Sequence, residues 1–82
     1  LQTKKLFSAT DGVLSIQINA GSQLKEHVTN VPAILVCVIG EVTFENEKGS
    51  KEILIPGDYV NIETNVKHWV TAANDSNLLL IK

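Results

Sequence analysis

Hydrophobic and polar positions alternate over short stretches of this chain, and the helical period of three to four residues is almost absent. Leu14 to Ile18 alternates apolar and polar side chains, which is typical of a strand with one buried face. Similar stretches recur between segments rich in Gly, Asn, Asp and Pro. The expected strands cover residues 14–18, 24–28, 33–39, 41–45, 51–55, 59–62, 68–72 and 78–81. The pattern therefore predicts an all-β fold.

Turn signals separate these expected strands. Residues 46–49 predict a hairpin turn in which Gly49 can adopt a positive φ, and residues 56–58 predict a second tight turn. Pro32 stands where a strand begins, so its missing N–H removes no interior ladder bond. So many short strands must close on themselves, because they would otherwise leave exposed sheet edges. We expect one domain over residues 1–82, with residues 1–12 forming a strand or an arm.

Charge and composition exclude several classes of partner. The 82 residues carry a formal net charge of −2 and contain no cluster of Lys or Arg, so we expect no nucleic-acid partner. The longest apolar runs, Ile34 to Ile39 and Leu78 to Ile81, are shorter than the ~18 residues that span a bilayer, so we expect no membrane partner. No secretory signal pattern is present, which predicts a cytoplasmic protein. Cys37 is the only cysteine, so no internal disulfide forms.

The first half of the sequence contains a motif similar to one found in the cupins, a family of small double-stranded β-barrels (jelly rolls). Gly21 and His27 match the Gly and the first His of that motif, and Gly40 matches its closing Gly. Thr29 stands in place of the motif's second His, and Ala33 stands in place of its Glu. The match therefore supports the fold more strongly than it supports the family's metal chemistry.

The second half resembles the second cupin motif in the same way. Gly57 and His68 match its Gly and its His. The usual Pro, Gly and Asn of the motif are replaced by Glu63, Asn65 and Ala72. Together the two motifs cover about residues 14–82 and imply a cupin-like double-stranded β-barrel. The resemblance also implies a homodimer, but it does not select a function, because cupins include enzymes, sugar-binding domains and storage proteins.

Strand alternation predicts which side chains line the inside of the barrel, because residues two apart on a strand share a face. The set is mostly apolar with a few polar groups, which is usual for a site that binds a small molecule. The expected ligand-binding pocket consists of His27, Thr29, Leu35, Cys37, Val66, His68 and Val70.

The resemblance implies that His27 and His68 can act as metal ligands, for a divalent ion such as Zn, Fe, Ni or Mn. Catalytic zinc normally has three protein ligands, and the iron oxygenase pattern needs two His and a carboxylate. Thr29 is a poor ligand and Ala33 is none, so we favour two neutral imidazoles hydrogen-bonded in a pocket. Cys37 could add a thiolate ligand, but a lone buried Cys is more often a small hydrophobic side chain.

Three functions follow from the sequence, and whether the protein is an enzyme stays open. The favoured hypothesis is a barrel that binds a small-molecule ligand without catalysis. The second is a metal-dependent oxygenase or isomerase that uses His27 and His68, and the third is a regulatory or structural subunit with a vestigial site. We also expect a homodimer that buries Trp69 and the N-terminal segment, although Trp69 could instead pack beneath that segment.

Overall fold

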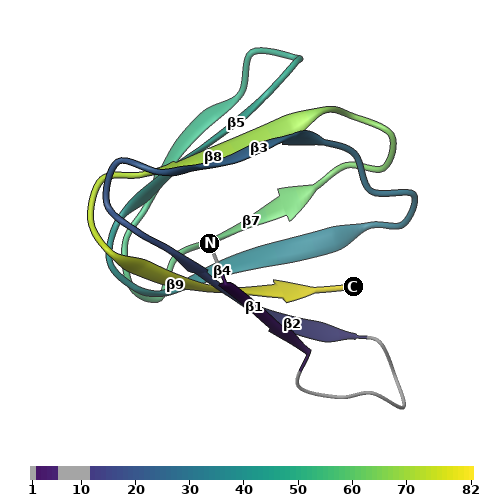
Figure 1. The fold of residues 1–82 in the computed structure, drawn as a ribbon. Helices are drawn as coiled ribbons and strands as arrows, with labels where there is room; N and C mark the ends of the chain where they lie inside the picture. Colours follow the sequence, from purple (N-terminus) through teal and green to yellow (C-terminus); the bar gives the residue numbers. More distant parts are fainter. Residues whose placement is uncertain (1, 6–11) are drawn as a thin grey trace.

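The computed structural model describes residues 2–5 and 12–82, with side chains described from residue 12 onward. These residues form two facing antiparallel sheets and no helix, which confirms the predicted all-β, jelly-roll fold (Figure 1). The strands are β1 (Gln2–Lys5), β2 (Val13–Ile18), β3 (Gln23–His27), β4 (Ala33–Ile39), β5 (Val42–Asn46), β6 (Lys51–Leu54), β7 (Tyr59–Ile62), β8 (His68–Ala72) and β9 (Ser76–Ile81).

The chain crosses repeatedly between the two sheets. One sheet has the order β1-β2-β9-β4-β7, and the other has the order β3-β8-β5-β6. Strands far apart in sequence are therefore neighbours: β9 lies between β2 and β4, and β8 lies between β3 and β5. This order places β3 and β8, which carry the two histidines, side by side.

The hydrophobic core lies between the sheets and follows from strand alternation. On β4, Ala33, Leu35 and Cys37 are buried, whereas Ile34 and Val36 face outward and are half-buried. The largest fully buried side chains come from both sheets: Phe44, Ile18, Leu35, Leu78, Val42, Val70 and Cys37. Burial of this apolar surface is the main stabilising contribution to such a fold.

One end of the barrel is closed by hydrogen bonds around Ser76. The Ser76 hydroxyl donates to the Asn74 carbonyl (2.7 Å) and accepts from the Glu41 N–H (3.1 Å). Gly40, with φ +95°, lies directly against Ser76, and a side chain there would meet its Oγ and Cα atoms. The closed end is thus held by a buried serine and a residue that must be glycine.

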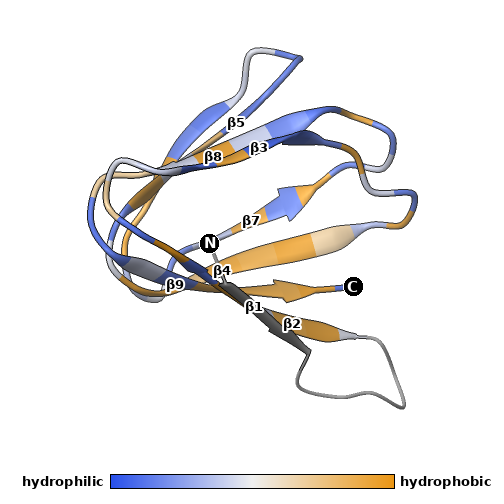
Figure 2. Ribbon diagram, in the orientation of Figure 1, coloured by the Kyte–Doolittle hydropathy of each residue, from blue (hydrophilic) through white to orange (hydrophobic). Residues whose placement is uncertain are grey.

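The outer face of the five-stranded sheet is apolar over three neighbouring strands. Tyr59 on β7 pairs with Val36 on β4, which pairs with Leu79 on β9. Figure 2 shows β4 and β9, the two central strands of this face, coloured as hydrophobic over most of their length, inward and outward residues together. The N-terminal strand β1 belongs to this sheet, whereas Trp69 lies half-buried on β8 of the other sheet. Part of the N-terminal segment, residues 6–11, lies outside the described residues.

Within residues 2–5 and 12–82 there is no helix with the length and apolar character needed to cross a bilayer.

Candidate functional site

A local irregularity in β3 turns His27 toward the inside of the barrel. Leu24 pairs with Val70, and His27 pairs with His68, so the two residues between them on β3 lie opposite a single residue of β8. This is the effect of a β-bulge, in which one strand carries an extra residue. On a regular strand, residues three apart would face opposite sides of the sheet. The irregularity lets both Leu24 and His27 share the inner face.

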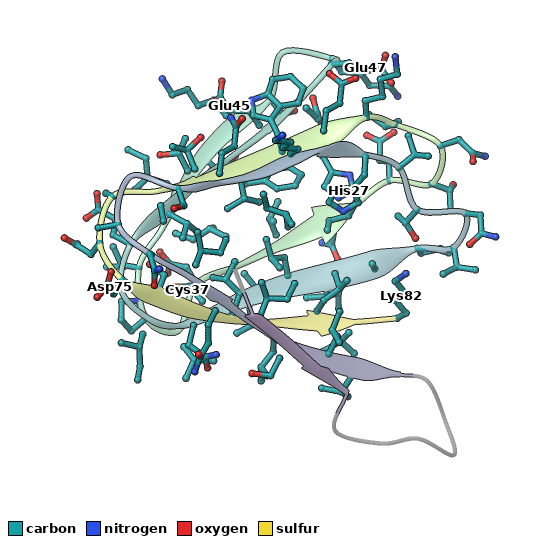
Figure 3. The ribbon with its side chains drawn as sticks, in the orientation of Figure 1. His27, Cys37, Glu45, Glu47, Asp75 and Lys82 are labelled. Carbon is teal, nitrogen blue, oxygen red and sulfur yellow. The ribbon has the colours of Figure 1, made fainter. Side chains whose placement is uncertain are left out.

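The two histidines meet at the end of the barrel opposite Ser76. Their Nε2 atoms lie 3.1 Å apart, and their ring centroids lie 4.2 Å apart with the rings inclined at 61°. His68 is 3% exposed, whereas His27 is exposed to solvent. Figure 3 shows His27 directed from β3 into the space between the sheets. The pair therefore has one buried member and one member that an incoming molecule can reach.

Backbone carbonyls orient both imidazole rings. The Nδ1 atom of His27 lies 2.8 Å from the Lys25 carbonyl oxygen, and the Nδ1 atom of His68 lies 3.3 Å from the Val66 carbonyl oxygen. A carbonyl oxygen only accepts hydrogen bonds, so these contacts place a proton on each Nδ1. Two neutral rings with those protons would present two Nε2 lone pairs to each other. Such a pair of lone pairs is suited to a metal ion held between the two Nε2 atoms.

The distance between the Nε2 atoms also fits metal coordination. Two metal–nitrogen bonds of about 2.0–2.1 Å span 3.1 Å when they meet at an angle of roughly 100°, which a tetrahedral or octahedral ion accepts. Carbonyl groups that hold the opposite ring nitrogen are the usual support of a histidine ligand. However, no group of three His, Cys, Asp or Glu side chains that could hold a metal occurs among the described residues. The remaining ligands would have to come from water or from a bound molecule.

Phe44 and Lys82 complete the surroundings of His68, and neither was predicted as a site residue. The Phe44 ring stacks on the His68 ring, with centroids 5.7 Å apart and an angle of 26°. Burial lowers the pKa of His68, and the positive charges of His27 and Lys82 lower it further, against the opposing effect of the Val66 carbonyl. Alternation along β9 from Leu78 places Lys82 on the inner face, so the sequence pattern already contained a signal for Lys82 as a site residue.

Thr29 and Val66 lie in the two loops next to the histidines. The Thr29 hydroxyl donates to the Val31 carbonyl (2.8 Å) and accepts from the Val31 N–H (3.3 Å), so local bonds already satisfy it. The Thr29 carbonyl accepts from the Asn65 N–H (2.8 Å), which ties the two loops together. Thr29 and Val66 are both buried, with 6% and 8% exposure. They shape the site but offer it no free polar group.

The other three predicted pocket residues belong to the packed interior. Leu35 and Val70 are part of the hydrophobic core. Figure 3 places Cys37 at the end of the barrel away from His27, where its Sγ lies 3.7 Å from the Gly40 carbonyl oxygen. Burial raises the pKa of the Cys37 thiol, and the charge of Asp58 raises it further. Cys37 therefore packs as a small neutral side chain, away from the histidines.

A surface hollow lies at the histidine end of the barrel, at the ends of β4, β7 and β9. Its volume is about 260 Å³. Its lining is mostly apolar and consists of Pro32, Ala33, Ile34, Asn61, Ile62, Ile81 and Lys82. Lys82 is thus close to both the hollow and His68.

No known family model matches the chain, and no curated protein matches it. The structure, however, is similar to solved cupins. A cupin superfamily protein from Desulfitobacterium hafniense has a TM-score of 0.88 at 17% identity, over 99% of this chain and 74% of that one. A cupin-like protein from Thermotoga maritima has a TM-score of 0.82 at 23% identity, over 98% and 66%. The CENP-C cupin domain of Drosophila melanogaster has a TM-score of 0.80 at 18% identity, over 92% and 62%.

These similarities establish the fold. The chain spans 60% to 78% of the lengths of solved structures such as a protein of unknown function from Streptococcus pyogenes and a cupin-2 domain protein from Shewanella frigidimarina. The resemblance that the two sequence motifs indicated is confirmed, because the strands form the cupin barrel.

Proposed function

We propose, from the premise that this chain has the cupin fold, that it binds a small molecule at the end of the barrel where His27 and His68 meet. The observation that carries this proposal is the pair of Nε2 atoms, 3.1 Å apart, with one ring buried and the other exposed. A polar pair beside apolar walls is the usual composition of a small-ligand site.

Each residue of the site has a separate part in this binding. His27 is the accessible polar group and contacts the ligand through its imidazole. His68 orients His27 from the buried side, and Phe44 holds the His68 ring in place by stacking. Core side chains such as Leu35 and Val70 fill the barrel behind the pair, so the ligand occupies the outer end only.

The test is a screen of small molecules by NMR on the isotopically labelled protein. We expect binders to shift the resonances of β3, β8 and the two loops beside the histidines. His27→Gln should weaken such binders roughly three- to tenfold, the usual value of one hydrogen bond. Glu26→Gln is the matched control, because Glu26 is adjacent in sequence but lies 3.6 Å from Lys67 on the outer surface. Binders that shift only other surfaces would contradict the proposal.

A second candidate is a metal-dependent enzyme, an oxygenase or isomerase. The specific observation in its favour is that both Nδ1 atoms face carbonyls while both Nε2 atoms converge. His27 and His68 would hold a divalent ion, which would supply Lewis-acid or redox chemistry to a molecule bound beside it. Because only two protein ligands are present among the described residues, the affinity should be modest.

Metal content separates the two candidates. The protein should be purified without a histidine tag, and the metal per protomer measured by plasma emission spectroscopy. Under the second candidate, wild type and Glu26→Gln carry metal, and His27→Ala and His68→Ala both lose it. Binding should also weaken at acidic pH, because protonated imidazole does not coordinate a metal. Trace metal in all four proteins would exclude the metal-dependent candidate.

A further inference from the structure

Lys82 lies at the histidine end of the barrel and forms no ion pair with any residue of 2–5 or 12–82. Its backbone N–H donates to the Gly12 carbonyl (2.8 Å), which fixes the start of its side chain beside β2. Figure 3 shows the Lys82 side chain at the same end of the molecule as His27. Among the described residues no carboxylate lies within ion-pair distance of its ammonium, in contrast to Lys48, whose Nζ lies 2.8 Å from Glu63. Lys82 is therefore available to an anion from outside the chain.

The hollow beside Lys82 is suited to an apolar group. Its walls come from the ends of three strands, and Ala33 and Ile62 form its buried side. At about 260 Å³ it is slightly smaller than the pockets that hold drug-sized ligands. The ligand that fits such walls is small, and most of its surface must be apolar, since the lining offers few hydrogen-bonding groups.

We propose that the small molecule bound at this end of the barrel is a carboxylate with an apolar body, whose carboxylate pairs with Lys82 and whose body occupies the adjacent hollow. This inference rests on the proposed small-molecule function and specifies its ligand class. One ammonium matches the single charge of a carboxylate. A phosphate group carries more charge and more oxygen atoms, and the apolar lining would leave those oxygen atoms without partners.

Two matched comparisons test the ligand class. Hexanoate, hexanamide and acetate are titrated into the protein and followed by NMR. Hexanoate should bind, and hexanamide should bind roughly two- to fivefold more weakly, because an ion pair with a solvent-exposed ammonium contributes modestly to affinity. Acetate, which keeps the charge but lacks the apolar body, should also bind more weakly than hexanoate.

Variants of Lys82 test whether its ammonium pairs with the carboxylate of the ligand. In Lys82→Gln, the preference for hexanoate over hexanamide should disappear, and Lys82→Arg should retain it. Lys48→Gln is the control, because it removes the same charge from an exposed lysine that does not line the hollow. Equal affinity of wild type for hexanoate and hexanamide, or no binding of hexanoate, would overturn the inference. So would an equal loss of preference in Lys48→Gln and Lys82→Gln.

The outcomes also distinguish this inference from the function on which it rests. If neutral compounds bind at the histidine end and hexanoate does not, the ligand class is wrong and the proposed function stands. If hexanoate binds through Lys82 and His27→Gln has no effect on any ligand, the role of the histidines is wrong. If no compound binds at this end, both proposals fail.

Discussion

At the scale of single residues, the buried environment of His68 affects how the stability of the fold depends on pH. Its ring is buried against Phe44, and burial together with His27 and Lys82 lowers its pKa in the folded protein. In the unfolded chain the same imidazole has a pKa of about 6.5. Between the folded and unfolded values the unfolded state binds more protons than the folded state, so acid favours unfolding.

We therefore predict that the free energy of unfolding decreases as the pH is lowered below about 7 and continues to decrease until the folded pKa of His68 has been passed. Urea denaturation at a series of pH values between 5 and 8, with a chelator present, measures this slope. His68→Gln should have a shallower slope over that interval, whatever its stability at pH 8. An unchanged slope in His68→Gln would assign the effect to other groups.

The residues also show what the sequence could and could not predict. Alternation correctly placed Ala33, Leu35 and Cys37 on one face of their strand, but a shared face does not fix position along the barrel. Cys37 lies near Gly40, at the far end from the histidines. The position of Lys82 was predictable in principle, because it follows the inward residues of β9 by alternation. However, a lysine just after a strand is normally assigned to solvent, so alternation alone does not single it out.

At the scale of elements, the strand positions were largely predictable because each strand has one buried face and Gly-rich or Asn-rich ends. The expected strand at residues 33–39 has the observed bounds of β4, Ala33–Ile39. The irregularity in β3 was not predictable, because a bulge depends on the register with the partner strand β8. Regular alternation through residues 24–28 would place Leu24 and His27 on opposite faces, whereas the structure puts them on the same face.

The turn between β4 and β5 gives a second prediction. Gly40→Ala should lower the free energy of unfolding by at least about 2 kcal/mol, since it combines a strained positive φ with overpacking. The new Cβ would lie 2.7 Å from the Ser76 Cα, a backbone atom that cannot move aside easily. Gly57→Ala is the control, because Gly57 has a similar φ of +97° and no atom within 4 Å of the added Cβ. Urea denaturation of both variants measures the difference, and equal losses would show that φ alone determines the effect.

At the scale of the whole molecule, we predict that the protein forms a homodimer through the outer face of its five-stranded sheet. Tyr59 is 63% exposed on this face, and Val36 and Leu79 lie beside it in register. The sequence suggested a dimer built on Trp69 and the N-terminal segment together. The structure puts them in different sheets, and β1 belongs to the apolar one.

Sedimentation at micromolar concentration tests the association. Leu79→Glu should give a monomer, because it places a charge in the middle of the apolar face and leaves it unpaired in a contact. Trp69→Ala changes a half-buried residue of the opposite sheet and should leave the dimer intact. A monomeric wild type would refute the dimer, and dissociation of Trp69→Ala alone would assign the contact to the other sheet.

The position of β3 at the edge of its sheet has a kinetic consequence. Among the described strands β3 pairs only with β8, and its ladder is interrupted between Leu24 and His27. Segments held by few hydrogen bonds open at lower free energy than the core, without global unfolding. We predict that the backbone amides of β3 exchange with deuterium faster than those of β9, which lies between two strands. Equal exchange rates would contradict this prediction. Each such opening would carry His27 away from His68, so the local opening of one edge strand would set how long the histidine pair stays together.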